Sequence, residues 1–189
     1  MCSSDLIDKD TTGLLVIAKT LESHTDLVAQ LQSRTMRREY EAIVQGVMTG
    51  GGKVDAPLGR HPTQRTRRAV VASGKDAVTH YRVVERYRAR THIRLALETG
   101  RTHQIRVHMM HIGYPLLGDQ DYGGRLRLPK ASSPAFIREL QAFRRQALHA
   151  QRLELIHPTT ADLMAWEAPL PEDFVAMLRT LKADLNGTL

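Results

Sequence analysis

The sequence is poor in residues that cross-link a chain or anchor it in a membrane. Its 189 residues include one cysteine, Cys2, which excludes an internal disulfide and a multi-cysteine metal site. The longest apolar run, residues 14–18, is far shorter than the about 20 residues of a transmembrane helix. Residues 1–9 lack the basic start and apolar stretch of a signal peptide, so a cytoplasmic protein without a membrane partner is expected.

Acidic residues are fewer than basic residues. The chain has 27 Lys and Arg against 20 Asp and Glu, a net charge of +7, which favours a polyanionic partner such as nucleic acid. Acids are missing altogether from residues 60–75, which contain Arg60, Arg65, Arg67 and Arg68. This segment is either a solvated basic loop or an arm that contacts RNA phosphates, and such an arm would bind RNA in a salt-sensitive way.

Strand and helix patterns alternate over a length typical of one domain. Apolar runs and alternation predict strands over 14–18, 39–45, 70–71, 78–84 and 93–97, and a hairpin of 153–156 with 163–166. Helical spacing predicts helices over 23–33, with a Ser23 and Asp26 capping box, over 102–113, with Thr102 as cap and Gly113 as terminator, and from Pro171 to Leu181. Residues 53–68 are expected to form a loop. Hairpins outnumber crossovers, so the expected fold class is α+β, with a mixed, mostly antiparallel sheet flanked by helices and loops.

Asp8 opens an Asp-Lys-Asp-Thr-Thr-Gly stretch ahead of an apolar run. Such residues commonly form turns, because their side chains bond to nearby backbone amides. Asp8, Asp10, Thr12 and Gly13 also match the start of an EF-hand calcium loop. Lys19, however, stands at the twelfth position, where calcium needs a bidentate Glu, so calcium is set aside.

Tyr40 and Arg106 each have an ordinary structural interpretation. Tyr40 fits a strand aromatic that packs in the core, and Arg106 fits a solvated helix face with a weak pair to Glu98. The start of that helix, however, crowds basic side chains: Arg101, His103, Arg106 and His108. Positive charge is unfavourable near a helix N-terminus, so a compensating anion is expected, either a substrate phosphate or a buried carboxylate.

A metal site is not expected. His108 and His111 could share a helix face, but no His-Glu-x-x-His pattern or carboxylate partner accompanies them.

Six blocks, in order, carry a resemblance to a known family. They are Asp-Lys-Asp-Thr-Thr-Gly-Leu at 8–14, Tyr-Glu-Ala at 40–42, Thr-Gly-Arg-Thr-His-Gln-Ile-Arg-Val-His at 99–108, Pro-Leu-Leu-Gly-Asp at 115–119, Tyr-Gly-Gly at 122–124 and Arg-Gln-Ala-Leu-His-Ala at 145–150. Together they resemble the RluA/RluD family of ribosomal RNA pseudouridine synthases, most closely its RluD branch. The resemblance covers residues 8–180. It implies the pseudouridine synthase fold and the isomerisation of uridine within RNA, without cofactor or metal.

The resemblance also implies residue roles. Asp8 matches the catalytic aspartate, which acts as nucleophile or removes a sugar proton. Tyr40 matches the tyrosine that stacks on the flipped base and helps to remove the C5 proton, and Arg106 matches the basic partner of the aspartate. Further substrate contacts are expected from Leu148, as an apolar floor under the base, and from Arg101, His103, Gln104, Arg60, Arg65, Arg67 and Arg68.

The first residues depart from the family pattern. Family members read His-Arg-Leu-Asp up to the catalytic aspartate, whereas this chain has Asp5, Leu6, Ile7 and Asp8. The missing arginine is the one expected to help displace the flipped base. Residues 1–7 are therefore interpreted as an atypical, non-native leader. Residues 8–189 are interpreted as a catalytic domain without its N-terminal part, whose uncovered sheet edge predicts poor solubility.

The sequence thus predicts a monomeric pseudouridine synthase that acts on large-subunit (23S) ribosomal RNA, with no protein partner. The alternative is a non-catalytic RNA-binding fragment that uses the same basic residues. The set of Asp8, Tyr40 and Arg106 favours the enzyme, because binding alone does not need a carboxylate that faces the RNA.

Overall fold

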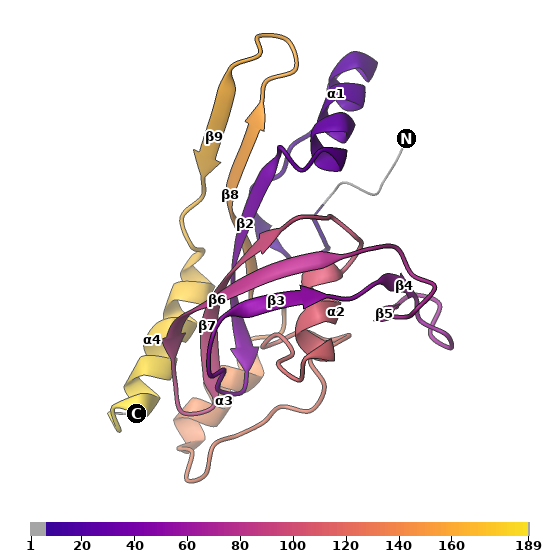
Figure 1. Cartoon of the computed structure of the whole chain (residues 1–189). Helices are drawn as coiled ribbons and strands as arrows, with labels where there is room; N and C mark the ends of the chain where they lie inside the picture. Colours follow the sequence, from indigo (N-terminus) through magenta and orange to yellow (C-terminus); the bar gives the residue numbers. More distant parts are fainter. Residues whose placement is uncertain (1–6, 189) are drawn as a thin grey trace.

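A seven-stranded sheet forms the centre of the structure, a computed structural model that describes residues 7–188 (Figure 1). The strand order is β1-β8-β2-β7-β6-β3, and β9 pairs with β8. The pair of β1 and β8 is parallel and the other pairs are antiparallel, which confirms the predicted fold class. The predicted leader lies, apart from Ile7, outside the described residues. The strands are β1 (Thr12–Gly13), β2 (Arg37–Gln45), β3 (Gly52–Asp55), β4 (Leu58–Arg60), β5 (Arg68–Val70), β6 (Val78–Arg86), β7 (Arg90–Leu97), β8 (Leu148–Ile156) and β9 (Leu163–Glu167), and the helices are α1 (Leu21–Gln32), α2 (Gln104–His111), α3 (Pro134–Ala142) and α4 (Glu172–Leu185).

Helices cover both faces of the sheet around β2. Ala42 and Val44 pack with side chains of α2 on one face, whereas Ile43 packs with side chains of α3 and α4 on the other. Figure 1 shows α2 and α4 on opposite sides of the strands. The predicted strand over 39–45 is confirmed, but its expected half-buried character is wrong beyond Tyr40, because both faces are covered from Glu41 to Gln45.

The predicted buried strand over 14–18 is wrong. Strand β1 ends at Gly13, whose φ of 105° favours glycine, and a Cβ there would lie 2.2 Å from the Ala150 carbonyl oxygen. Beyond Gly13 the side chains alternate between packed and exposed positions: Leu14 and Val16 pack under α1, while Leu15 and Ile17 are exposed. Among the residues that the structure describes, no strand pairs with 15–18, so the segment is extended without belonging to the sheet.

The N-cap of α1 lies three residues before the expected one. Thr20 is the N-cap, and its side-chain oxygen accepts a hydrogen bond from the Ser23 backbone N–H at 3.1 Å. The capping box of Ser23 with Asp26 is therefore wrong. The end predicted near Ser33 is confirmed, since Ser33 is the C-cap.

Residues 53–68, predicted as a loop, contain strands on both sides of a shorter loop. Strand β3 lies at the edge of the main sheet and buries only Val54, so it carries no apolar alternation that the sequence could reveal. Strands β4 and β5 pair with each other in a separate two-stranded sheet. The predicted strand at 70–71 therefore pairs with β4, through Val70 opposite Leu58.

The remaining elements largely follow the sequence. Strand β7, the β8–β9 hairpin and α4 confirm their predictions. Helix α2 ends as predicted with Gly113 at a positive φ of 84°, but Thr102 is not its cap: His103 takes that position in a left-handed conformation, without a side-chain cap bond. Helix α3 was not predicted. None of the helices described between residues 7 and 188 is long and apolar enough to cross a membrane.

Candidate active site

A cleft of about 810 Å³ lies between α1 and the loop that leads into α2. Its walls come from distant parts of the chain: the turn at Asp8, strand β2, residues 97–105 and strand β8. Several of the residues predicted for the site line it: Asp8, Tyr40, Arg101, His103, Gln104 and Leu148. The fold thus brings together four of the sequence blocks that resemble the synthase family.

Contacts with the start of β8 hold the turn that carries Asp8. The turn closes on itself through the Thr11 backbone N–H, which donates to the Asp8 carbonyl at 3.0 Å. Gln146, buried just before β8, donates from its side-chain amide to the Lys9 carbonyl at 2.6 Å and to the Thr11 hydroxyl at 3.0 Å. The Asp8 block and the block at 145–150 therefore depend on each other.

Arg106 is buried and is surrounded by three carboxylates. Its Nε and Nη2 donate to the two oxygens of Asp119 at 2.7 and 2.9 Å, and Nη2 also donates to Asp121 at 2.9 Å. The carboxylate of Asp8 lies 3.5 Å from Nη1. Burial alone would lower the pKa of Arg106, but the three carboxylates outweigh burial and raise it. The guanidinium is therefore permanently charged beside Asp8.

The anion expected at the start of α2 is thus a buried carboxylate. Asp119 is fully buried, and its two-point contact with Arg106 makes it the principal partner. The predicted pair of Arg106 with Glu98 is wrong, because Glu98 contacts Arg34 and His80 instead. Asp119 stands in the Pro-Leu-Leu-Gly-Asp block, so the sequence contained the signal, although no role had been assigned to it.

Tyr40 is half-buried in β2, where it lines the cleft. Burial raises the pKa of its hydroxyl and the charge of Arg38 opposes that rise, but the pKa remains above its ordinary value. Arg38 also lines the cleft and was missed. Because side chains two apart in a strand share a face, the spacing from Arg38 to Tyr40 could have revealed it.

Leu148 supplies an apolar wall. It begins β8 opposite Ala42 of β2, is almost fully buried and belongs to the same core cluster as Ala42. Leu148 and Tyr40 line the same cleft, so part of its wall is apolar.

Gln104 and Arg101 make protein contacts at the rim of the cleft. The buried Gln104 amide oxygen accepts from the Thr99 hydroxyl and the Arg101 backbone N–H, and its nitrogen donates to the Val78 carbonyl and the Thr79 hydroxyl. Arg101 is exposed, and its Nε donates to a backbone carbonyl at 3.0 Å. The contacts of Gln104 favour a role in shaping the loop, whereas Arg101 keeps a charge at the rim.

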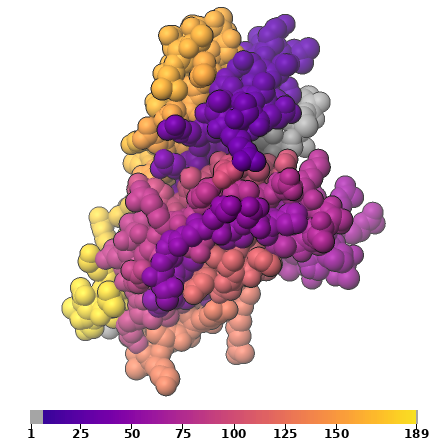
Figure 2. All heavy atoms as spheres, in the orientation of Figure 1, coloured from indigo at the N-terminus to yellow at the C-terminus, as the bar shows by residue number. Residues whose placement is uncertain are grey.

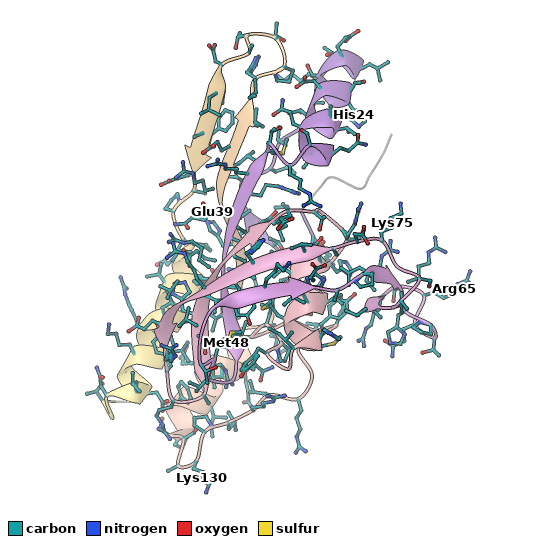
Figure 3. The ribbon with its side chains drawn as sticks, viewed as in Figure 1. His24, Glu39, Met48, Arg65, Lys75 and Lys130 are labelled. Atoms are coloured by element: carbon teal, nitrogen blue, oxygen red, sulfur yellow. The ribbon has the colours of Figure 1, made fainter. Side chains whose placement is uncertain are left out.

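The predicted basic residues at 60–68 lie outside the cleft lining. They belong to the β4–β5 hairpin and its loop, called the basic arm here (residues 60–68), which projects from the body of the protein at the right of Figure 2. Arg65, labelled in Figure 3, points into solvent at its tip. Arg67 and Arg68 are half-buried, and the guanidinium of Arg67 lies 6.0 Å from the ring centre of Tyr122.

Both ring nitrogens of His108, which the sequence offered as a possible metal ligand, make hydrogen bonds within the protein. Nδ1 bonds to the Thr79 hydroxyl at 2.9 Å and Nε2 bonds to the Ala56 carbonyl at 3.0 Å. Across residues 7–188, no group of three or more His, Cys, Asp or Glu side chains is arranged to hold a metal ion.

Comparisons with known proteins agree with this geometry. The family described as RNA pseudouridylate synthase matches residues 6–111. Ribosomal large subunit pseudouridine synthase D of Pseudomonas aeruginosa is 64% identical over 178 residues, which are 94% of this chain and 56% of that protein. The Escherichia coli K12 protein of the same name is 57% identical over 180 residues, 95% of this chain and 55% of that protein. This chain therefore spans just over half the length of these relatives.

Solved structures give the same result. Human RNA pseudouridylate synthase domain containing 4 superposes with a TM-score of 0.72 at 27% identity, over 93% of this chain and 74% of that chain. Human RNA pseudouridylate synthase domain containing 1, at 23% identity and a TM-score of 0.69, shares the fold over 87% of this chain and 67% of that chain. The RluD-type resemblance predicted from the sequence is confirmed, and the chain belongs to the RNA pseudouridylate synthase family.

Proposed function

We propose that this chain isomerises uridine to pseudouridine in large-subunit (23S) ribosomal RNA, with Asp8 as the nucleophile. The observation that carries the proposal is the Asp8 carboxylate 3.5 Å from the buried Arg106 guanidinium, in a cleft that Tyr40 and Leu148 also line. The choice of RNA rests on the two bacterial relatives, whose names state a large-subunit ribosomal substrate. The predicted cytoplasmic location fits such a substrate and stays a prediction.

The cleft suits a base that has left its stack. Extruding a base from RNA costs a few kcal/mol, and stacking on an aromatic side chain returns about 1–3 kcal/mol per base. Tyr40 offers the aromatic face and Leu148 the apolar wall. Leu6, which replaces the arginine expected to help extrusion, lies outside the described residues. Extrusion therefore has to rely more on these stacking surfaces and on the basic arm.

In the proposed reaction, the Asp8 carboxylate attacks C1′ of the ribose, and the N1–C1′ bond breaks to release uracil as an anion. The base turns in the cleft, its C5 bonds to C1′, and the Asp8 carboxylate leaves. The C5 proton is then lost and N1 gains a proton, so atoms and charge balance. Arg106 acts by holding the Asp8 carboxylate in place, through the ion pair of its Nη1 with that carboxylate at 3.5 Å.

The chemistry of Tyr40 limits its role. Since burial raises the pKa of its hydroxyl, Tyr40 is a neutral phenol at physiological pH. A neutral phenol can receive the C5 proton only if it passes its own proton to an acceptor. We therefore assign Tyr40 a stacking role and a proton-relay role, rather than that of a phenolate base.

Tritium release from unmodified large-subunit rRNA labelled at uridine C5 tests the proposal. The wild-type chain should release tritium, whereas Asp8→Asn should release none and still bind RNA, because the substitution keeps the shape of the side chain. Small-subunit rRNA is the matched substrate control. Binding of both variants without release from either RNA would contradict the enzyme and favour the non-catalytic RNA-binding alternative.

A further inference from the structure

Tyr122 connects the basic arm to the group around Arg106, and the reaction proposed above gives it no role. Its turn is closed by Asp119, whose carboxylate accepts the backbone N–H groups of Asp121 and Tyr122, both at 2.9 Å. The same carboxylate holds Arg106. The backbone of Tyr122 and the guanidinium of Arg106 are therefore positioned by one buried anion.

The ring of Tyr122 contacts the same arginine directly. The guanidinium of Arg106 lies 4.9 Å from the ring centre, within the range of a cation–π interaction. The edge of the ring meets the imidazole of His103, with ring centres 5.5 Å apart. The guanidinium of the arm residue Arg67 also lies near this ring, 6.0 Å from its centre.

The hydroxyl of Tyr122 joins the arm to the cleft. It accepts the backbone N–H of Arg68 at 2.8 Å and bonds to Nδ1 of His103 at 2.7 Å. If the hydroxyl gives its own proton to Nδ1 of His103, it accepts one hydrogen bond from Arg68 and donates one to His103, so both of its contacts are satisfied. Burial has the largest effect on the pKa of His103 and lowers it. The lowered pKa fits a neutral imidazole ring that accepts a hydrogen bond at Nδ1.

His103 is itself in an unusual position. It lines the cleft and caps α2 at φ 59° and ψ 19°, a left-handed conformation that is uncommon for residues other than glycine, although His, Asn and Asp adopt it more often than the rest. No side-chain cap bond holds it there, so the hydrogen bond to Tyr122 is a contact that fixes the imidazole and the first turn of α2. That turn carries Arg106.

We propose that Tyr122 is a positioning residue that couples RNA binding on the basic arm to the placement of His103 and Arg106 beside Asp8. RNA phosphates that contact the arm fix the backbone at Arg68, and the hydroxyl of Tyr122 passes that restraint to His103. The inference rests on the proposed function, because it concerns the same cleft and the same substrate.

The substitution Tyr122→Phe tests the coupling, since it removes the hydroxyl and keeps the ring under Arg106. Single-turnover tritium release at saturating rRNA should slow about tenfold, the size expected when the hydrogen bond that positions His103 is lost, with little change in the Kd for RNA. Tyr114→Phe is the matched control: Tyr114 packs against the core at the far end of α2, and its hydroxyl has no hydrogen-bond partner among residues 7–188. It should react at the wild-type rate.

A double variant separates coupling from a merely structural effect. His103→Asn removes the imidazole but introduces asparagine, which tolerates the left-handed backbone at this position. If Tyr122 acts through His103, adding Tyr122→Phe to His103→Asn should slow the reaction by less than about twofold. A full tenfold further loss, or a Tyr122→Phe rate equal to wild type, would overturn the proposal.

Hydrogen exchange gives a readout that needs no catalysis. Binding of the rRNA should slow exchange both in the basic arm and in residues 101–106 of the wild type, but only in the arm of Tyr122→Phe. Equal protection of residues 101–106 in both proteins would overturn the coupling even if tritium is released. A wild type that releases no tritium, yet shows this difference in protection, would sink the proposed function and leave the coupling supported.

Discussion

Two of the three carboxylates around Arg106, those of Asp119 and Asp121, should differ sharply in their contribution to stability. Asp119 has no exposed side-chain surface, whereas the side chain of Asp121 is 51% exposed. Removing one partner of a buried ion pair costs about 3–5 kcal/mol, because it leaves a charge buried without compensation. Asp8 and Asp121 keep part of that compensation for Arg106, so Asp119→Asn should cost about 3 kcal/mol, the lower end of that range.

Thermal or urea unfolding measures this difference, with Asp121→Asn as the matched control. For a chain of this size, about 3 kcal/mol corresponds to a loss of roughly 6–12 °C in Tm. Asp121→Asn removes a solvent-screened pair and should cost at most about 1 kcal/mol. Equal losses for the two variants would refute the assignment of Asp119 as the principal partner of Arg106.

Three further predictions concern the base-stacking residue, the basic arm and a buried acid. Tyr40→Phe should lower single-turnover tritium release about 10²-fold or more and leave the Kd for RNA nearly unchanged, because it keeps the stacking face and loses the proton relay; an unaffected rate would remove Tyr40 from the chemistry. Arg65→Ala, at the exposed tip of the arm, should reduce the slope of log K for RNA against log salt by roughly one, and an unchanged slope would show that Arg65 contacts no phosphate. Burial favours a higher pKa for Glu41, but contacts with His92 and Arg94 outweigh burial and lower this pKa. The ionised Glu41 therefore stabilises the fold above its unfolded pKa of about 4.3, and this stabilisation is lost as pH falls through the lower folded value. Glu41→Gln should therefore lower the free energy of unfolding at pH 7 and weaken its dependence on pH below about 5, and parallel curves for the two proteins would contradict this.

The sequence predicted elements whose pattern is local. Helix α4 has an apolar stripe and a proline at its start, and the β8–β9 hairpin has alternation around a turn, so both were found. Strand β3 was missed because an edge strand that buries one side chain has no apolar period. Helix α3 was missed although Ser133 and Pro134 form a cap followed by a first-turn proline, a signal that is present in the sequence.

Contacts between distant parts of the chain determine the features that the sequence did not predict. The run at 14–18 has the composition of a buried strand, but whether it pairs depends on a neighbour that no local pattern specifies. The resemblance placed Asp8, Tyr40 and Arg106 correctly in one region, and their roles stay predictions. Asp119 and Tyr122 stand in two of the blocks that carry the resemblance, but no role was predicted for the two-point contact of Asp119 with Arg106 or for the contact of Tyr122 with the arm. Those contacts bring together side chains from separate loops, and only the folded chain shows them.

The most direct measurement is the pseudouridine content of unmodified large-subunit rRNA after incubation with this chain, determined by digestion to nucleosides and chromatography. The wild-type chain should convert at least one uridine per RNA molecule, and Asp8→Asn should convert none while it binds the same RNA with similar affinity. Wild-type protein that binds the RNA and forms no pseudouridine, or an Asp8→Asn variant that forms as much as the wild type, would contradict the assignment of this cleft as a pseudouridine synthase site.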